Sequence, residues 1–130
     1  VIKDWLITKD INATELVIEN GSGLSRIERI NSAHLGQMLV SAYHSAVMPE
    51  FMASLPILGL DGTTTKRLKI SLSAGRVHIK TGSIDGVSAI AGYVLNARGK
   101  RYVLIMMVNH SNSSASKTAQ DNLMEWIYSH

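Results

Sequence analysis

The sequence has no cysteine, only two prolines, few aromatic side chains and no long apolar run. Without cysteine there is no disulfide, no thiolate nucleophile and no cysteine-ligated metal site, while a cytoplasmic and an envelope location stay equally open. The longest apolar run, Tyr102 to Val108, has the length of a strand and is far shorter than the ~18 residues of a membrane span. What remains, with 45% hydrophobic and 18% charged residues, is the composition of an ordinary globular protein.

No segment of the chain concentrates charges of one sign. The formal net charge is +3, and the lysines and arginines neither form a run nor interleave with aromatic residues. Nucleic-acid binding is therefore not expected, whereas a small cationic excess suits substrates that carry carboxylates.

The length and the first residues bear on the domain organisation. At 130 residues the chain is long enough for one domain with a real core. It begins at Val1 without methionine or a secretion signal, and Lys3-Asp4-Trp5-Leu6 has the character of the interior of a chain. We therefore expect residues 1–130 to be a single region taken from a longer protein.

The N-terminal third is predicted to hold two helices. Residues 3–10 look like the tail of a helix, and Leu16-Val17-Ile18 look like a short strand that runs into a glycine-rich segment. Asn31 or Ser32 can cap a second helix, because apolar residues then recur at the three- and four-residue spacing of an amphipathic helix. These apolar residues are Leu35, Met38, Leu39, Ala42, Tyr43 and Ala46.

Short helical segments and turns are expected in the middle of the chain. Pro49 suits the first turn of a helix that ends before Pro56. Asp61-Gly62-Thr63 is predicted to be a turn, and Thr64 to Ile70 one or two further helical turns.

The C-terminal half changes to strands. Arg76 to Thr81, Val87 to Leu95 and Lys100 to Asn109 are predicted strands, with a hairpin connection at Asn96-Ala97-Arg98-Gly99 between the last two. Tyr102 to Val108 lacks polar alternation, which predicts burial on both faces.

A closing helix completes the predicted fold. Ser111 to Ser116 is a polar loop, and one face of the helix after it is predicted to carry Ala115, Ala119, Leu123 and Trp126 or Ile127. The fold class is therefore α+β, with helices first, then a three-stranded antiparallel meander, then a C-terminal helix.

The most informative motif is Lys80-Thr81-Gly82-Ser83, which lies between apolar strand-like segments. A Lys-Thr-Gly strand forms one wall of the active site in penicillin-recognising serine enzymes. By itself the tripeptide also fits an ordinary strand end that is followed by a glycine turn.

Several further segments strengthen the first interpretation, and together the chain resembles the C-terminal part of class C penicillin-binding proteins. These are serine D-alanyl-D-alanine carboxypeptidases and endopeptidases that trim peptidoglycan, built on a transpeptidase-like, β-lactamase-like domain. The resemblance covers about two-thirds of the chain. The matching segments are Asn20-Gly21-Ser22-Gly23-Leu24-Ser25-Arg26, Leu55-Pro56-Ile57 with Gly59, Asp61-Gly62-Thr63, Gly75 to Ser83 and Val87 to Tyr93.

Two motifs of that family are not found where the family has them. Such enzymes use a Ser-x-x-Lys nucleophile motif, then Ser-x-Asn, then Lys-Thr-Gly. The chain contains no Ser-x-Asn, and its one Ser-x-x-Lys, Ser114-Ala115-Ser116-Lys117, follows the Lys-Thr-Gly segment instead of preceding it. We therefore interpret Ser114 as a helix cap or a loop residue, and we expect the nucleophile to precede Val1.

The resemblance implies roles for four consecutive residues. Thr81 would hydrogen-bond the terminal carboxylate of the substrate or of a β-lactam, and Lys80 would supply positive potential and contact the absent Ser-x-Asn serine. The backbone N–H of Ser83 would be one of two oxyanion donors, a contact that typically lowers a barrier by ~3 kcal/mol. Gly82 would let the strand approach the ligand closely. Lys80 and Ser83 are thus the catalytic candidates, and Thr81 and Gly82 bind substrate.

Two further residues, Arg26 and Asp85, are candidate substrate contacts. Arg26 can grip a second carboxylate, such as that of diaminopimelate in a stem peptide, or it can pair with an acid inside a structural loop. Asp85 can line the rim of the cleft, or it can be a solvated turn aspartate beside Gly86. The five histidines show no metal-ligand spacing, so no metal and no cofactor are expected.

The leading hypothesis is a portion of an envelope or periplasmic serine D-Ala-D-Ala carboxypeptidase that acts through an acyl-enzyme. Its ligands would be a peptidoglycan stem peptide or a β-lactam. It would be inactive alone and would pair with its missing N-terminal portion, or self-associate, through an exposed strand edge at Tyr102 to Val108. The alternatives are a non-catalytic binding or assembly module and, less favoured by spacing, an unrelated hydrolase that uses His110 with a loop serine.

Overall fold

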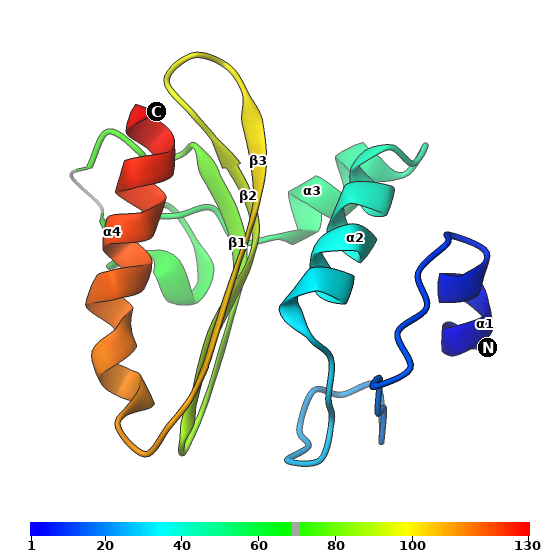
Figure 1. Cartoon of the computed structure of the whole chain (residues 1–130). Coiled ribbons are helices and arrows are strands. Elements are labelled where there is room, and N and C mark those ends of the chain that lie inside the picture. The colour runs from blue at the N-terminus through cyan, green and yellow to red at the C-terminus, as the bar shows by residue number, and fades with distance from the viewer. Residues whose placement is uncertain (69–70) are drawn as a thin grey trace. The chain divides into compact units, whose positions relative to one another are not determined.

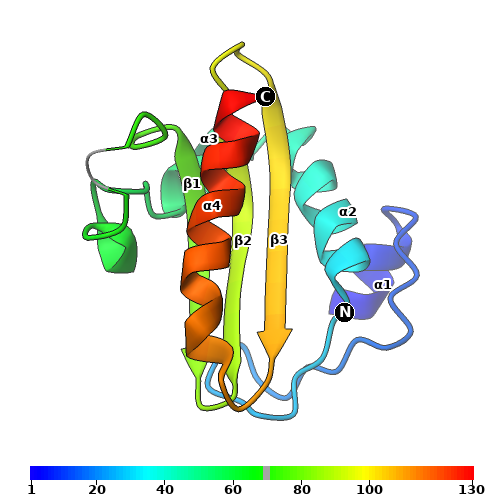
Figure 2. The ribbon, with the colours of Figure 1, turned by 60° about the vertical axis from the view of Figure 1, so that its left-hand side comes forward.

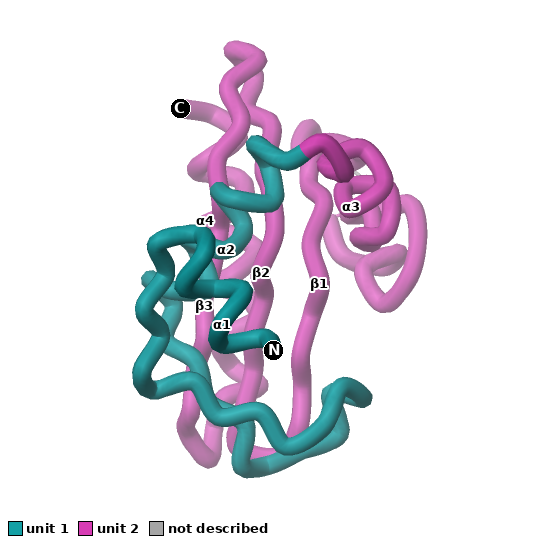
Figure 3. The backbone as a smooth tube through the Cα atoms, turned by 90° about the vertical axis from the view of Figure 1, so that its right-hand side faces the viewer, with its two compact units in different colours: residues 1–45 teal, residues 46–130 magenta. Residues whose placement is uncertain are grey.

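The structure is a computed structural model that describes residues 1–68 and 71–130. These residues form two compact units, Val1–Ser45 and Ala46–His130, which Figure 3 colours separately. Each unit has its own apolar core. Of the helical turns predicted over Thr64 to Ile70, the part at residues 69 and 70 lies outside the described residues.

The first unit contains helices α1, Ile2–Ile7, and α2, Ser32–Tyr43. Both predicted helices are confirmed, although α1 ends before residue 10. The predicted strand at residues 16–18 is wrong, because Val17 forms only one isolated antiparallel bridge, with Arg29. Of this segment only Leu16 packs into a small core, whereas Val17 and Ile18 are exposed. That core consists of Leu6, Ile11, Ala13 and Leu16, with Ile30 and Met38 against it.

The start of α2 shows why the helix begins where the sequence predicts. Asn31 is the N-cap, and its side-chain oxygen accepts the backbone N–H of His34 at 2.8 Å. The carboxylate of Glu15 accepts the Asn31 backbone N–H at 3.1 Å and contacts Nδ1 of His34 at 2.7 Å. The hydrogen bond from His34, with that from Asn31, lowers the pKa of Glu15 to about 2.

The second unit is built on a three-stranded antiparallel sheet. Its strands are β1, Val77–Ile84, β2, Val87–Leu95, and β3, Arg101–Asn109, in the spatial order β1-β2-β3. Helix α3, Met48–Ser54, precedes the sheet, and helix α4, Ser116–Ser129, follows it. Figures 1 and 2 show α4 lying across one face of the sheet. The predicted α+β order of helices, meander and closing helix is therefore confirmed.

The core of the second unit lies between the sheet and α4. It contains buried residues from all three strands, from α4 and from the segment between α3 and β1: Leu58, Val77, Ile79, Ile90, Val94, Leu104 and Met124. On the other face, the ring of Phe51 in α3 packs edge-on against Tyr93, with ring centroids 6.4 Å apart. Leu104 is the buried residue of β3, and 40% of Tyr102 is exposed, so the prediction that this strand is buried on both faces is wrong. Tyr102 and Leu104 are two residues apart and so share one face of β3, yet they differ in burial. An unbroken apolar run does not reveal how much of each face is covered.

The predicted apolar stripe of α4 is confirmed at Leu123 and Ile127 and is wrong at Ala115, Ala119 and Trp126, which are exposed. The residues that meet the core are Gln120, Leu123, Met124 and Ile127, at helical spacing, while Ala119 and Trp126 point outward. The sequence pattern missed Gln120 because a polar side chain is not expected on the buried face, and it missed Met124. The amide of Gln120 donates to the hydroxyl of Ser88 at 3.0 Å, which satisfies both buried polar groups.

One glycine fixes how closely the strands approach. Gly92 of β2 has φ +155°, and a Cβ atom placed on it would lie 2.1 Å from the backbone oxygen of His78. Gly92 is paired with Ile79, directly before the Lys-Thr-Gly segment. A side chain at this position would force β1 away from β2, so glycine is needed here for the register of the sheet.

Candidate functional site

The candidate site is the outer edge of β1, where no other strand of the described residues pairs with it and Ile57 forms only an isolated bridge with His78. The backbone N–H of Leu58 donates to the oxygen of Val77 at 2.9 Å, and that of Ile79 donates to the oxygen of Pro56 at 3.0 Å. Both bonds lie on the side of β1 away from β2. Because alternate residues of an antiparallel strand turn their backbone polar groups to opposite edges, Thr81 and Ser83 also turn theirs away from β2.

Lys80 places its charge at this same edge. Its ammonium donates to the backbone oxygen of Thr81 at 2.7 Å, and the side chain is exposed. After the buried residues Val77 and Ile79, the rest of β1 is exposed except for Thr81, which is half-buried. The second half of the strand therefore combines a cation, a hydroxyl and outward-pointing amides on an accessible edge, a combination that can bind a carboxylate.

The hydroxyl of Thr81 is not alone on this edge. Its Oγ1 lies 2.8 Å from Oγ1 of Thr63, which belongs to the 3₁₀ helix η1, Gly62–Thr64. The predicted turn at Asp61-Gly62-Thr63 is thus confirmed as the start of a 3₁₀ helix. The sequence does not predict the contact between the two threonines, because 18 residues separate them.

The structure brings four of the six predicted site residues together. Lys80, Thr81, Gly82 and Ser83 lie consecutively on β1, which extends three residues beyond the predicted strand end. Asp85 is exposed in the turn between β1 and β2. Arg26 is exposed in the other unit, so its substrate contact stays a prediction.

His78 shares the Lys80 face of β1 but differs in environment. Its Nδ1 is buried and has no hydrogen-bond partner among the described residues. Burial, together with the positive charge of Arg101, lowers the pKa of His78. A neutral imidazole is therefore the favoured form at this position.

Ser114 and His110, the serine of the misplaced Ser-x-x-Lys and the histidine of the alternative hydrolase, have local structural roles. Ser114 lies in the 3₁₀ helix η2, Ser113–Ala115, which precedes α4, so it is a turn residue and not the cap. Nδ1 of His110 accepts the backbone N–H of Asn112 at 3.0 Å. Neither observation supports a hydrolase centred on His110.

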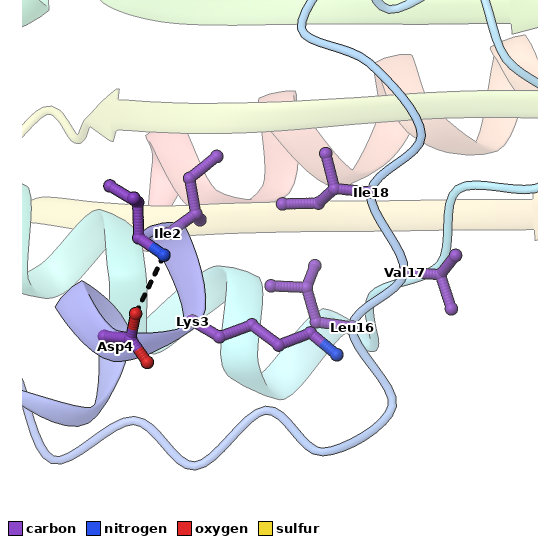
Figure 4. A pocket seen from close by; sticks show the side chains of 7 residues that line it. Ile2, Lys3, Asp4, Leu16, Val17 and Ile18 are labelled. Carbon is purple, nitrogen blue, oxygen red and sulfur yellow. Dashed lines mark ion pairs between the residues drawn. The ribbon is translucent and has the colours of Figure 1, made fainter.

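Other features of the described residues do not point to a second chemistry. Across residues 1–68 and 71–130 there is no group of three metal-ligating acidic, histidine or cysteine side chains. None of the helices in that part of the chain has both the length and the apolar character needed to cross a bilayer. The first unit has a pocket of about 620 Å³, lined by residues 1–4 and 16–18, which includes none of the predicted site residues. Figure 4 shows the side chains that line it.

Comparison with known proteins decides the family. The sequence pattern of the D-Ala-D-Ala carboxypeptidase 3 (S13) family matches residues 1–129. The chain belongs to this family. The resemblance to class C penicillin-binding proteins is therefore confirmed.

Individual relatives are about 30% identical to this chain over the aligned residues. A D-alanyl-D-alanine carboxypeptidase of Actinomadura sp. is 32% identical over 115 residues, which are 85% of this chain and 21% of that protein. The D-alanyl-D-alanine carboxypeptidase DacB of Haemophilus influenzae is 29% identical over 129 residues, 96% of this chain and 27% of that protein. The chain thus spans about a quarter of the length of these relatives.

Solved structures of other proteins have a similar fold. Penicillin binding protein 4 (dacB) from Haemophilus influenzae, in complex with a novel β-lactam, superposes with a TM-score of 0.77 at 29% identity. That comparison covers 85% of this chain and 26% of the other. A second structure of penicillin binding protein 4 from the same organism has a TM-score of 0.73 at 24% identity and supports the fold alone.

Proposed function

We propose that this chain is the part of a serine-type D-Ala-D-Ala carboxypeptidase that binds the terminal carboxylate of a peptidoglycan stem peptide. The observation that supports the proposal is the outer edge of β1, where the ammonium of Lys80 donates to the backbone oxygen of Thr81 and the hydroxyl of Thr81 lies beside that of Thr63. The alternation of backbone groups turns the N–H of Ser83 toward the same edge. The names of the S13 relatives give the same reaction class.

The edge suits both the shape and the charge of such a substrate. An extended peptide can pair with the outward backbone groups of Thr81 and Ser83 as an added strand. Its C-terminal carboxylate would accept from the Thr81 hydroxyl within the field of Lys80. The Ser83 N–H would then lie beside the scissile carbonyl as one of two oxyanion donors. Gly82 keeps the strand free of a side chain between these two contacts.

The covalent chemistry is assigned to residues outside this sequence. A serine hydroxyl would attack the peptide carbonyl, D-Ala would leave with a proton on its amine, and water would hydrolyse the acyl-enzyme. Because the chain has no Ser-x-Asn and its Ser-x-x-Lys follows β1, we propose that residues 1–130 are the C-terminal portion of the domain and are inactive alone. Intact mass spectrometry after β-lactam treatment should show no stoichiometric adduct, and an adduct would overturn this assignment.

Binding can be tested on the chain itself by NMR with ¹⁵N labelling. Titration with an acyl-D-Ala-D-Ala peptide should shift the amide signals of Thr81 and Ser83. Thr81→Val and Lys80→Ala should each weaken binding about tenfold, the typical effect of losing one charge-assisted hydrogen bond. The control Lys66→Ala removes an exposed lysine outside this edge and should bind like the unchanged chain. Equal binding by all variants would instead favour a non-catalytic module that keeps the fold.

The family membership also motivates proposals about place and partners. We expect an envelope or periplasmic location, where peptidoglycan is found. Strand β3 is the other edge of the sheet, and an open edge is a template for pairing. We propose that it pairs with the preceding portion of the protein or with a second copy. Analytical ultracentrifugation of the chain should then show a concentration-dependent dimer, and strict monomer behaviour at high concentration would contradict self-association.

A further inference from the structure

We propose that Thr63 is a positioning residue for Thr81, which makes the edge of β1 selective for a carboxylate over a neutral chain end. This inference rests on the proposed function, since it concerns the same ligand. The observation behind it is the hydroxyl pair, with 2.8 Å between the two Oγ1 atoms, in which either atom can donate.

The number of protons in this pair decides what each hydroxyl can do. A threonine hydroxyl has one proton to donate and two lone pairs that accept. If Thr81 donated to Thr63, it would present only lone pairs to an approaching carboxylate and would repel it. If Thr63 donates to Thr81, the proton of Thr81 is free to point at the carboxylate. Thr63 thereby sets the direction of the Thr81 hydroxyl, and the two bonds in series strengthen each other.

The loop that carries Thr63 is well anchored beside β1. The carboxylate of Asp61 accepts the backbone N–H of Ile57 at 2.5 Å. The buried hydroxyl of Thr64 donates to the backbone oxygen of Asp61 at 2.9 Å. Pro56, directly before Ile57, accepts the N–H of Ile79 from β1 itself. These bonds hold Thr63 in place independently of its own hydroxyl, so its side chain can be changed without releasing the loop.

Comparing the affinities of a carboxylate ligand and a carboxamide ligand tests this role of Thr63. A carboxylate can only accept, so it needs the Thr81 proton, whereas a carboxamide can also donate to a Thr81 lone pair. Loss of the Thr63 hydroxyl should therefore weaken carboxylate binding more than carboxamide binding. A purely structural role would weaken both ligands equally.

The experiment uses NMR titration of the whole chain with an acyl-D-Ala-D-Ala peptide and its C-terminal carboxamide. Thr63→Val should lower the ratio of the two affinities about tenfold, and Thr63→Ala should do the same. Thr63→Ser keeps the hydroxyl and should restore the ratio. The control is Thr65→Val, which removes a hydroxyl that donates to the backbone oxygen of Gly62 at 2.7 Å within the same loop. It should leave the ratio unchanged.

The outcomes separate this inference from the proposed function. If the unchanged chain prefers the carboxylate but Thr63→Val keeps that preference, the role of Thr63 is overturned while the proposed function stands. The same holds if Thr65→Val lowers the ratio as much as Thr63→Val. If the unchanged chain binds neither peptide at β1, the proposed function fails, and the role of Thr63 fails with it.

Discussion

Replacing Gly92 by alanine should damage the site from a position that touches no ligand. The added Cβ would lie 2.1 Å from the oxygen of His78 and 2.8 Å from the Cα of Ile79, whereas ordinary contacts of this kind are 3.4–4 Å long. Both neighbours are backbone atoms of β1, so a strand must move by about an ångström or more. Overpacking costs about 1–3 kcal/mol, and the positive φ adds roughly 1–3 kcal/mol.

The expected loss for Gly92→Ala is therefore about 2–6 kcal/mol, a large part of the roughly 5–15 kcal/mol that stabilises a typical domain. Urea unfolding followed by circular dichroism measures it. Gly99→Ala is the matched control, because Gly99 has φ +79° in the β2–β3 turn but open space around it, and its loss should be about 1 kcal/mol. Equal unfolding free energies for the two variants would refute the close-approach argument.

Three further changes test the packing and electrostatics. Asp121→Asn removes the charge partner of Arg67, whose Nη2 lies 2.5 Å from the carboxylate, and should cost about 1–3 kcal/mol in urea unfolding because both side chains are mostly buried. Met124→Ala opens a cavity in the core under the sheet and should cost about 3 kcal/mol by the same measurement. Because the pKa of Glu15 is lowered from 4.5 to about 2, its carboxylate should stabilise the first unit fully above pH 4.5, and this stability should be lost as the pH falls toward 2. Glu15→Gln should abolish this pH dependence of the thermal unfolding temperature. A loss below 0.5 kcal/mol for either of the first two, or an unchanged acid profile for the third, would contradict these assignments.

Local signals in the sequence predict the elements whose ends are set by local chemistry. Asn31 caps α2 through its own side chain, and Pro49 lies in the first turn of α3, so both starts are visible in the sequence. The hairpin is equally local, because the Asn96 side chain accepts the N–H groups of Arg98 and Lys100 within the turn. Strand β2 has the predicted bounds, since turn residues flank it on both sides.

Features that depend on tertiary contacts could not be predicted in this way. Strand β1 continues through Gly82 to Ile84 because β2 pairs with it there, whereas the glycine alone suggests an end. The burial of β3 depends on which of its faces α4 covers, and an apolar run carries no information about that.

The candidate site likewise contains residues that the sequence predicts and one residue that it does not. The motif predicts Lys80 to Ser83 as a group, and the alternation of backbone groups along β1 then places Thr81 and Ser83 on the open edge. Thr63 carries no signal of its own, because its part in the site arises only from a contact between two segments distant in sequence.

The most direct test of the account is where an acyl-D-Ala-D-Ala peptide lies on this chain. Intermolecular nuclear Overhauser effects measured on the labelled chain should join the methyl group of the terminal D-Ala to the amide protons of Thr81 and Ser83. Contacts found instead around the first-unit cavity at Ile2 and Leu16, or no contact at β1, would contradict the claim that this strand edge recognises the carboxylate.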